Sequence, residues 1–382
     1  MLIEIKGVQF VNKGAELMLH AIIQKAKEIW PDAEFCIKPN KNSPYKKRAQ
    51  VEAFQKLDIR KNIIDFNGLF YFLPKKLRDG LKGKWGIVTE ADIDVVLDAS
   101  GFSYGDQWST VILKQAAIEA KRLNKKGKHY IFMPQALGPF TSGDNQIAAK
   151  QAFESASVIF AREEESFEFA KACAKSANII QSPDFTNLVK PTHNREYAHL
   201  KGCVAVIPNS KMLSEKNQNS LWRNNYVEML QNIIELIQTN GEKVFLLNHE
   251  GKADRAICNQ INEALIDKLE VIEPENALEV KGVIGRSKFV VCSRYHGCIS
   301  ALSQCVPCIG TSWSHKYEQL FKEYGVSNYL LSPEYNKQQL SKILRGLFEN
   351  TEQESKNLKS PSKSFKSQSK ELWLTLEKQF KK

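Results

Sequence analysis

The sequence predicts an α/β protein built from two Rossmann-like domains with parallel sheets. Short apolar runs typical of buried strands alternate with longer segments whose apolar residues recur at helical spacing. This alternation occurs twice, on either side of a charged, proline-containing stretch at residues 190–200. A length of 382 residues suits about two domains. We therefore expect an N-terminal domain at residues 1–190, a C-terminal domain at 200–348, and a basic linker with a terminal helix at 350–382.

The N-terminal domain opens with a strand, a loop and a helix. Residues 2–8 are rich in β-forming side chains, residues 15–30 place apolar side chains close to the helical period, and Pro31 ends that helix. Later strands are expected at residues 33–38, 94–98, 129–133, 157–161 and 178–181. Later helices are expected at residues 109–125, 145–155 and 163–176. This order is typical of a doubly wound parallel sheet.

The C-terminal domain repeats the alternation without a sequence repeat. Its strands are expected at residues 203–207, 243–247, 289–292 and 307–310, and its helices at 226–238, 253–266 and 297–304. Ligands in such folds bind at the carboxyl ends of the strands, so two domains place the active site in the cleft between them. Residues 350–370 are rich in Ser, Lys, Gln and Glu, which predicts a mobile linker. Residues 371–382 predict a short terminal helix.

The composition is that of a globular protein with anionic partners. With 42% hydrophobic and 25% charged residues, the chain is neither disordered, collagen-like nor a coiled coil. No apolar run is long enough for a transmembrane helix, and the first residues predict a strand rather than a signal peptide. We therefore expect a cytoplasmic protein with reduced cysteines. The formal charge of +11 favours phosphorylated metabolites, nucleic acid or an anionic membrane as partners.

Two of the eight cysteines, Cys305 and Cys308, form a C-x-x-C pair. This spacing occurs in zinc half-sites and in redox pairs, but no second pair follows. We favour two small buried residues beside a strand. No other motif has metal-ligand spacing, so we expect no metal.

An anion site is expected between a buried strand and a helix, in the segment from Cys292 to Gly297. The free N–H groups and the dipole of the helix start favour an anion, and Arg294 adds a planar fork for a phosphate or carboxylate. His296 adds an imidazole, the side chain that can gain or lose a proton at physiological pH in proteins generally, and Lys316, on the loop after the next strand, would contact the same anion. In the alternative interpretation, Arg294 pairs with a carboxylate, His296 caps a helix and Lys316 is solvated.

This segment resembles the C-terminal signature of the polysaccharide pyruvyltransferases. That signature has an Arg-x-His at a helix start, a strand opened by Pro, and a Lys twenty residues after the His, which here are Arg294, His296, Pro307 and Lys316. Further motifs resemble the family's in the same order: Asn12-x-Gly14-Ala15-Glu16 (with Glu16 where Asp is more usual), Pro134-Gln135-Ala136-Leu137-Gly138-Pro139, Arg162-Glu163-x-x-Ser166, Ser182-Pro183-Asp184, and His249 with Asp254. The resemblance covers roughly residues 1–330.

The resemblance implies a GT-B-like arrangement of the two domains. It also implies transfer of pyruvate from phosphoenolpyruvate to two sugar hydroxyls of a bacterial surface polysaccharide or its lipid-linked precursor, giving a cyclic ketal. It places the donor at Arg294, His296, Lys316 and Arg162, and Gly297 lies in the same turn. Phosphoenolpyruvate carries a phosphate and a carboxylate, so two or three cations are needed to hold it. Protonation of its vinyl carbon needs a general acid, for which His296 is our candidate. Apart from this co-substrate we expect no cofactor.

The sugar hydroxyls must lose protons, which calls for a carboxylate or a His near the turns of the N-terminal domain. The candidates on this acceptor side are Asn12, Glu16, Asp98, Asp106, Gln135 and Asp184. Each of the carboxylates could equally cap a helix or form a turn.

Two other functions compete with this one. A GT-B glycosyltransferase would hold a nucleotide sugar at the same basic helix start, but the second half lacks the paired Glu that grips a nucleotide ribose. A nucleic-acid binder is suggested by charge alone, and the basic residues are not interleaved with aromatic ones on an obvious platform. We therefore expect an enzyme without a nucleic-acid partner.

Residues 60–85 predict a location. They hold six apolar or aromatic side chains between positions 66 and 73, with seven basic and two acidic residues over the whole span. Apolar side chains beside a basic cluster are typical of an interfacial membrane anchor. We expect peripheral binding at the cytoplasmic face of the inner membrane, because members of the family often act on lipid-linked repeat units. The alternative is a buried loop packed on the N-terminal domain, with its lysines merely solvated.

Overall fold

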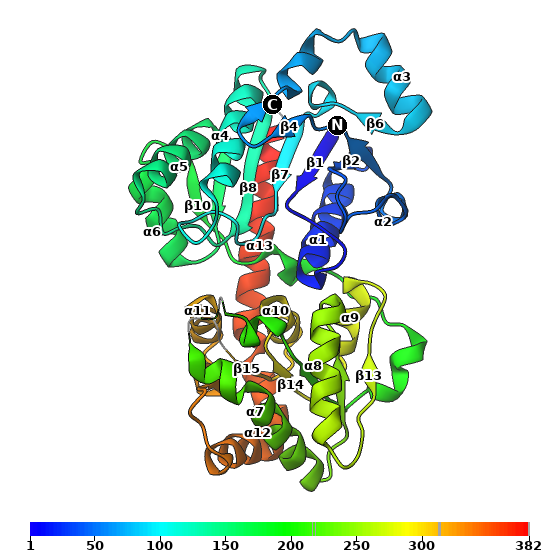
Figure 1. The fold of residues 1–382 in the computed structure, drawn as a ribbon, viewed down its shortest axis with the longest axis vertical. Coiled ribbons are helices and arrows are strands. Elements are labelled where there is room, and N and C mark those ends of the chain that lie inside the picture. Colours follow the sequence, from blue (N-terminus) through cyan, green and yellow to red (C-terminus); the bar gives the residue numbers. More distant parts are fainter. Residues whose placement is uncertain (216, 218, 312–314, 381–382) are drawn as a thin grey trace. The chain divides into compact units, whose positions relative to one another are not determined.

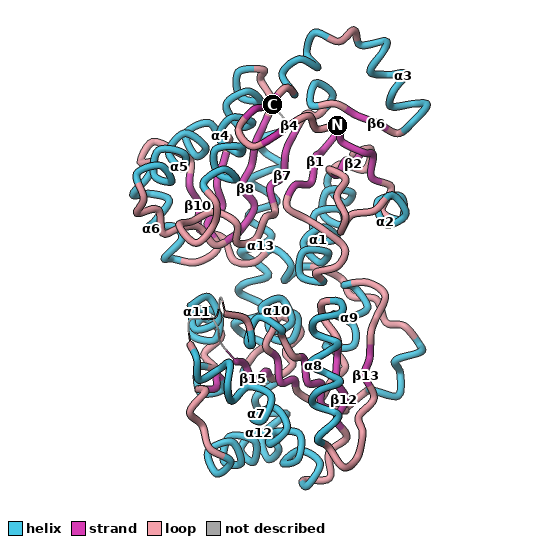
Figure 2. Tube along the Cα trace, viewed as in Figure 1, coloured by secondary structure: helices cyan, strands magenta, loops and turns pink. Residues whose placement is uncertain are grey.

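The structure, a computed structural model, describes residues 1–215, 217, 219–311 and 315–380. The chain divides into two compact units (Figure 1). The N-terminal unit comprises Met1–Phe10, Met18–Phe185 and the residues from Glu371 onward, and the C-terminal unit comprises Val11–Leu17 and Thr186–Lys370. Each unit contains a parallel sheet covered by helices, which confirms the predicted fold class (Figure 2). Residues 11–17, expected in the first domain, group instead with the C-terminal unit.

The sheet of the N-terminal unit has eight parallel strands in the order β10-β9-β8-β7-β1-β2-β3-β6. The strands are β1 Leu2–Lys6, β2 Glu34–Ile37, β3 Ala53–Lys56, β6 Ile87–Val88, β7 Val95–Asp98, β8 His129–Gln135, β9 Val158–Ala161 and β10 Ile179–Gln181. Every residue of β7 and β9 is buried, as expected for a parallel sheet covered on both faces. β8 continues through Pro134, where its prediction ended. Its pairing with β9 is irregular between Phe132 and Gln135, and such an irregularity tolerates a residue without an N–H group.

The helices of this unit are α1 Lys13–Ile29, which begins within the C-terminal unit, α2 Tyr45–Gln50, α4 Thr110–Lys125, α5 Gly143–Ser155 and α6 Glu164–Cys173. Ser109 and Ser142 cap α4 and α5 by accepting backbone N–H groups. Between β3 and β6 the chain makes an excursion. It contains the hairpin β4 Arg60–Lys61 and β5 Ile64–Asp65, the 3₁₀ turn η1 Asn67–Phe72 and the helix α3 Lys75–Trp85.

The sheet of the C-terminal unit has six parallel strands in the order β13-β12-β11-β14-β15-β16. The strands are β11 Val204–Ile207, β12 Val244–Leu247, β13 Val271–Ile272, β14 Val290–Cys292, β15 Cys308–Thr311 and β16 Leu330–Leu331. The helices are α7 Ser220–Thr239, α8 Gly251–Ala264, α9 Ala277–Ile284, α10 Tyr295–Leu302, α11 His315–Glu323 and α12 Lys337–Asn357. One continuous apolar core joins the sheet to these helices.

The tail differs from its prediction. Residues 350–370 are not a mobile linker, because α12 and α13 (Lys359–Phe380) run through them. The side chains that pack inward along this tail alternate in spacing between four and three residues, and they are Leu358, Ser362, Phe365, Ser369, Leu372 and Leu376. Since two of them are serines, the helical period does not show in the apolar residues alone.

Among the described residues, no helix has both the length and the apolarity needed to cross a bilayer.

Candidate functional site

In the C-terminal unit, polar side chains gather at the carboxyl ends of four neighbouring strands. Asn209 follows β11, His249 follows β12, Arg294 and His296 follow β14, and Lys316 follows β15. These strands are adjacent in the sheet, so their carboxyl ends share one edge. That edge is where ligands bind in doubly wound sheets.

The turn between β14 and α10 is held in place by hydrogen bonds to Ser293. Its hydroxyl accepts from the Tyr226 hydroxyl at 2.6 Å and lies 2.8 Å from the Thr311 hydroxyl, which donates to it. Its carbonyl accepts from Asn209 Nδ2 at 2.8 Å and from the Tyr317 hydroxyl at 2.9 Å. The turn that carries Arg294 and His296 is therefore fixed by four other elements or loops.

Arg294 is buried and held by two carboxylates. Its Nε lies 2.8 Å and its Nη2 2.5 Å from the carboxylate of Asp254, and its Nη1 pairs with Glu250. Asp254 also accepts the N–H of Ser210 at 2.9 Å. Burial opposes the charged form of Arg294, but the two carboxylates outweigh burial and raise its pKa. An anion that binds here would therefore share the guanidinium with Glu250, whose side chain is partly exposed.

His249 is the second imidazole of this edge, and the sequence named it only as part of a motif. It is buried, and its Nδ1 has no hydrogen-bond partner among the described residues. Burial is the main cause that lowers the pKa of His249 well below its usual range. Neighbouring cationic groups on Arg294, His296 and Lys13 lower it further. The imidazole is therefore neutral at pH 7, with one nitrogen unused.

The Asn12-x-Gly14 turn packs against His296 within the C-terminal unit. A Cβ on Gly14 would lie 2.4 Å from His296 Nδ1, so only glycine fits this contact. Asn12 Oδ1 caps α1 by accepting the N–H groups of Gly14 at 2.9 Å and Ala15 at 3.2 Å. Thus two motifs almost three hundred residues apart meet at one half-buried imidazole.

The same turn carries an ion pair. Lys13 Nζ lies 2.7 Å from the Glu16 carboxylate and 2.7 Å from the carbonyl oxygen of Glu275. Glu16 is buried.

Close packing at the start of α10 explains why residue 297 is a glycine. A Cβ on Gly297 would lie 2.5 Å from Cys292 Sγ, so glycine lets the helix approach β14. The first N–H groups of a helix have no acceptor within it, and they point toward the site of an anion. Lys316 Nζ lies 5.0 Å from the centre of the Tyr295 ring, a cation–π contact. Residues 312–314, which precede Lys316 in the sequence, lie outside the described residues.

In the N-terminal unit, four of the predicted residues lie at the carboxyl ends of neighbouring strands: Asp98 is the last residue of β7, Gln135 is the last residue of β8, Arg162 follows β9 and Asp184 follows β10. The carboxylate of Asp98 accepts from the hydroxyls of Tyr104 and Tyr130 at 2.5 Å each. Gln135 donates to the carbonyl oxygen of Asp98 at 3.1 Å. Its own Oε1 is buried and has no hydrogen-bond partner among the described residues.

Arg162 is held by carboxylates of its own unit. Its Nε lies 3.1 Å from Glu163 and its Nη1 3.5 Å from Asp184. Ser166 donates to Glu163 at 2.8 Å and accepts the N–H of Leu137 at 2.8 Å, which ties its own motif to the one at Pro134–Pro139. The pair of Arg162 and Asp184 adds the third motif. Arg162 and the other donor-side candidates belong to different units.

Asp106 braces a loop. Its carboxylate accepts the N–H and the hydroxyl of Thr141 at 2.6 Å each and Nδ2 of Asn145 at 2.8 Å. Burial opposes the ionisation of Asp106, but the hydrogen bonds of Asn145, Thr141 and Ser142 together outweigh burial and lower the pKa of Asp106 to about 2.

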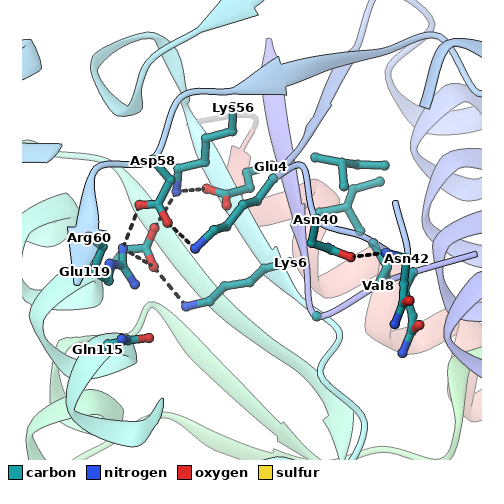
Figure 3. A pocket seen from close by; sticks show the side chains of 15 residues that line it. Glu4, Lys6, Val8, Asn40, Asn42, Lys56, Asp58, Arg60, Gln115 and Glu119 are labelled. Carbon is teal, nitrogen blue, oxygen red and sulfur yellow. Dashed lines mark hydrogen bonds and ion pairs between the residues drawn. The ribbon is translucent and has the colours of Figure 1, made fainter. Parts of the chain in front are cut away.

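A cavity of about 300 Å³ in the N-terminal unit contains residues that the sequence reasoning missed (Figure 3). Lys56 is buried and lies 2.5 Å from Glu4 and 2.6 Å from Glu119. Lys6 lies 2.9 Å and Arg60 3.4 Å from Glu119. Burial is the main cause that raises the pKa of Glu4 to about 7. The sequence feature that could have indicated this cavity is the presence of charged residues, Glu4 and Lys6, in the first buried strand.

Within the described residues, no group of three or more His, Cys, Asp or Glu side chains is placed to hold a metal ion. All eight cysteines are free thiols. Cys308 is buried at the start of β15, and Cys305 is half-buried just before it.

In comparisons with known proteins, a single family model spans most of these motifs. A family model, polysaccharide pyruvyl transferase, matches residues 12–315. The fold is similar to that of a putative UDP-N-acetylglucosamine 2-epimerase from Listeria monocytogenes, at 13% identity over 100% of this chain and 96% of that one, with a TM-score of 0.60. It is also similar to a UDP-GlcNAc 2-epimerase from Neisseria meningitidis bound to UDP-GlcNAc (13% identity, 99% of each chain, TM-score 0.61) and to S. aureus MnaA with UDP (12%, 94% and 92%, 0.57). Identities this low show the GT-B-like fold alone. No functionally curated protein matches.

Proposed function

Because the chain belongs to the polysaccharide pyruvyl transferase family, we propose that it moves pyruvate from phosphoenolpyruvate onto two hydroxyls of a sugar in a bacterial surface polysaccharide or its lipid-linked precursor. The product is a cyclic ketal. The observation that carries this proposal is the set of groups at one sheet edge of the C-terminal unit: Arg294, Lys316, a neutral His249 and His296, beside the start of α10.

The charges of this edge match the donor. Phosphoenolpyruvate has a phosphate and a carboxylate, and charge-assisted hydrogen bonds to Arg and Lys are the strong ones. Arg294 would bind one anionic group by exchanging its contact with Glu250 while Asp254 continues to orient the guanidinium. Lys316 and the first N–H groups of α10 supply the second set of donors. Arg162, from the N-terminal unit, is a further proposed donor contact.

The reaction balances with one proton donor and one proton acceptor. His296 protonates C3 of phosphoenolpyruvate while a sugar hydroxyl adds to C2 and loses its proton. The second hydroxyl then displaces inorganic phosphate from C2 and loses its own proton. Of the two protons released, one restores His296 and the other leaves with phosphate or solvent. General acid–base help of this kind is worth about 10²–10⁴ in rate.

The proton acceptor has two candidates at this edge. His249 is neutral, and its Nδ1 has no partner among the described residues. Glu16 lies on the turn that packs against His296. Asp98 and Asp106 each already accept several hydrogen bonds from their own unit, and these occupied oxygens disfavour them for this role.

The acceptor sugar is proposed to bind the N-terminal unit. Gln135 Oε1 is buried without a partner among the described residues, and it would accept a hydrogen bond from a sugar hydroxyl. The cavity lies in the same unit, at the carboxyl ends of β1, β2 and β3. It is lined by four cationic, three carboxylate and four amide side chains: Lys6, Lys38, Lys56, Arg60, Glu4, Asp58, Glu119, Gln9, Asn40, Asn42 and Gln115. Since both signs of charge are present with many amides, this lining suits a hydroxyl-rich ligand better than a strongly anionic one.

The test is product analysis with the full chain. The chain is incubated with phosphoenolpyruvate and a capsule-type repeat unit, and the acceptor is weighed by mass spectrometry. We expect a gain of one pyruvate less one water, together with release of inorganic phosphate. A parallel incubation with UDP-GlcNAc tests the glycosyltransferase alternative. Transfer of a sugar there, with no pyruvate gain in the first reaction, would replace the proposal.

A further inference from the structure

The excursion between β3 and β6 exposes an unusual amount of apolar surface. Eight large apolar side chains in residues 59–85 are exposed, and they are Ile59, Ile63, Ile64, Phe66, Leu69, Phe72, Leu77 and Trp85. Phe72 is 85% and Leu69 61% exposed. No residue of α3 is buried, although a surface helix normally buries one stripe. In Figure 1, α3 stands at the margin of the N-terminal unit, beside the edge strand β6. Many exposed apolar side chains in one segment indicate an interaction site.

The segment is nevertheless firmly attached to its unit. Asn67 is fully buried, accepts the N–H of Ile59 at 2.9 Å and donates to Asp58 at 2.6 Å. Arg78 pairs with Asp92, and Lys126 Nζ lies 4.9 Å from the centre of the Tyr71 ring. The apolar side chains therefore face outward from an ordered base. The alternative expectation, a buried loop with solvated lysines, does not fit these exposures.

The composition of α3 fits a water–lipid boundary. Leu77, Leu81 and Trp85 recur every fourth residue, so they share one side of the helix. Trp is favoured at the interface of a bilayer, where its ring sits at the level of the headgroups. Lysines beside such a stripe extend their charged ends toward the headgroups while their alkyl chains cover apolar surface. Lys84 Nζ lies 5.1 Å from the centre of the Trp85 ring, a cation–π contact.

The charge of the segment indicates which kind of partner binds this surface. The exposed lysines are Lys61, Lys75, Lys76 and Lys84, against the exposed Asp79. A second copy of the chain would bring this positive surface against itself, which like charges oppose. An anionic lipid surface complements it, and each Lys or Arg near such a surface contributes about 1 kcal/mol.

We propose that residues 59–85 bind the surface of an anionic lipid bilayer, with the apolar side chains of η1 and α3 entering the interface. The proposal does not depend on the pyruvyl transfer chemistry, because it rests on exposed residues of the N-terminal unit alone.

The test is co-sedimentation of the full chain with vesicles of phosphatidylcholine containing about one third phosphatidylserine. We expect the chain to pellet with these vesicles at low salt, to pellet much less at high salt, and to stay in solution with pure phosphatidylcholine. Two double variants separate the contributions: Leu69→Ser with Phe72→Ser, and Lys75→Glu with Lys76→Glu. Each should weaken binding about tenfold or more, since the second alone changes the charge by four. All four positions are exposed, so the fold should persist, and circular dichroism checks this.

Matched controls lie elsewhere on the surface. Ile266→Ser removes an apolar side chain that is 97% exposed, and Lys150→Glu with Lys175→Glu reverses two exposed charges. These variants should pellet nearly as the parent does. The proposal is overturned if the parent stays in the supernatant with anionic vesicles, or if the control variants reduce pelleting as much as the test variants. It is also overturned if sedimentation equilibrium shows a dimer that the Leu69→Ser and Phe72→Ser pair dissociates, because the surface would then be an interface between copies.

Discussion

The two units present the same kind of sheet edge with different chemistry. At the edge of the C-terminal unit, one buried group with a hydrogen-bonding atom that has no partner among the described residues is His249, and burial, followed by its cationic neighbours, lowers its pKa. At the edge of the N-terminal unit, one such group is Gln135, and it binds the backbone of a buried aspartate. A cationic edge with imidazoles suits an anionic donor that must be protonated, whereas an amide beside carboxylates suits a ligand that offers hydroxyls.

The arginines do not account for the difference between the two sheet edges. Arg294 is held by Asp254 and Glu250, and Arg162 is held by Glu163 and Asp184. A buried Arg between two acids is therefore common to both edges, and breaking either would leave a buried charge unpaired. The imidazoles, which the N-terminal edge lacks among its predicted residues, carry the difference. The comparison is tested most directly at His296.

Replacing His296 should have the largest effect. His296→Asn keeps a polar side chain of similar reach but cannot deliver a proton near neutral pH, so turnover should fall about 10²–10⁴-fold. Affinity for phosphoenolpyruvate, measured by calorimetry, should change far less. The control is His199→Asn, because His199 is exposed and pairs with Glu270 away from this edge. Near-normal turnover of the His296 variant would assign His296 to a helix cap.

Replacing Lys316 should weaken donor binding. Lys316→Ala removes a charge-assisted contact worth about 1.5–3 kcal/mol, so the Kd for phosphoenolpyruvate should rise about 10–150-fold. Lys322→Ala removes an exposed lysine from the same helix, α11, and should leave the Kd unchanged. Equal Kd values for parent and Lys316→Ala would exclude Lys316 from the donor site.

Much of the fold could be predicted from the sequence, because strands and helices of a doubly wound sheet have distinct apolar periods. The strands that escaped prediction have two to four residues, such as β3, β6 and β13, which are too short to show a period. The tail escaped because Ser362 and Ser369 occupy inward-facing positions that apolar residues usually fill. Small serines allow close helix packing there, and composition alone indicated disorder.

The candidate site could be predicted only where its residues lie close together in sequence. Arg294, His296 and Lys316 follow two adjacent strands, so spacing alone brought them to one edge. The partners of Arg294 lie about forty residues away, after another strand, and the contact of Gly14 with His296 spans most of the chain. The unused Nδ1 of His249 depends on burial, which no motif reveals.

Replacing Gln135 tests the acceptor side of the comparison. Gln135→Leu removes the amide oxygen that is proposed to accept a sugar hydroxyl, and one such hydrogen bond contributes about 0.5–1.5 kcal/mol. The KM for the acceptor should therefore rise about 2–12-fold, while the Kd for phosphoenolpyruvate stays unchanged. Gln135→Glu keeps an oxygen acceptor and should retain more of the acceptor affinity. A larger change in donor affinity than in acceptor KM would place Gln135 with the donor instead.

The pH dependence of stability tests the state of His249 directly. Its pKa is lowered in the folded chain, whereas in the unfolded chain it should be near the usual value of about 6.5. Above that pH both states are neutral at this residue, and the free energy of unfolding contains no pH-dependent contribution from it. Below that pH the unfolded chain binds a proton that the folded chain does not, so stability falls by up to about 1.4 kcal/mol per pH unit until the folded pKa is reached.

Urea unfolding between pH 5 and pH 8 should show this loss in the parent and a flatter profile in His249→Asn. His199→Asn is the control. Hydrogen bonding to Glu270 raises the pKa of His199, so His199 stabilises the folded chain at low pH, and the substitution should not flatten the loss of stability below pH 6.5. Identical slopes for the parent and His249→Asn, or an NMR titration of His249 near pH 6.5 in the folded chain, would show that the imidazole is not held neutral at this edge.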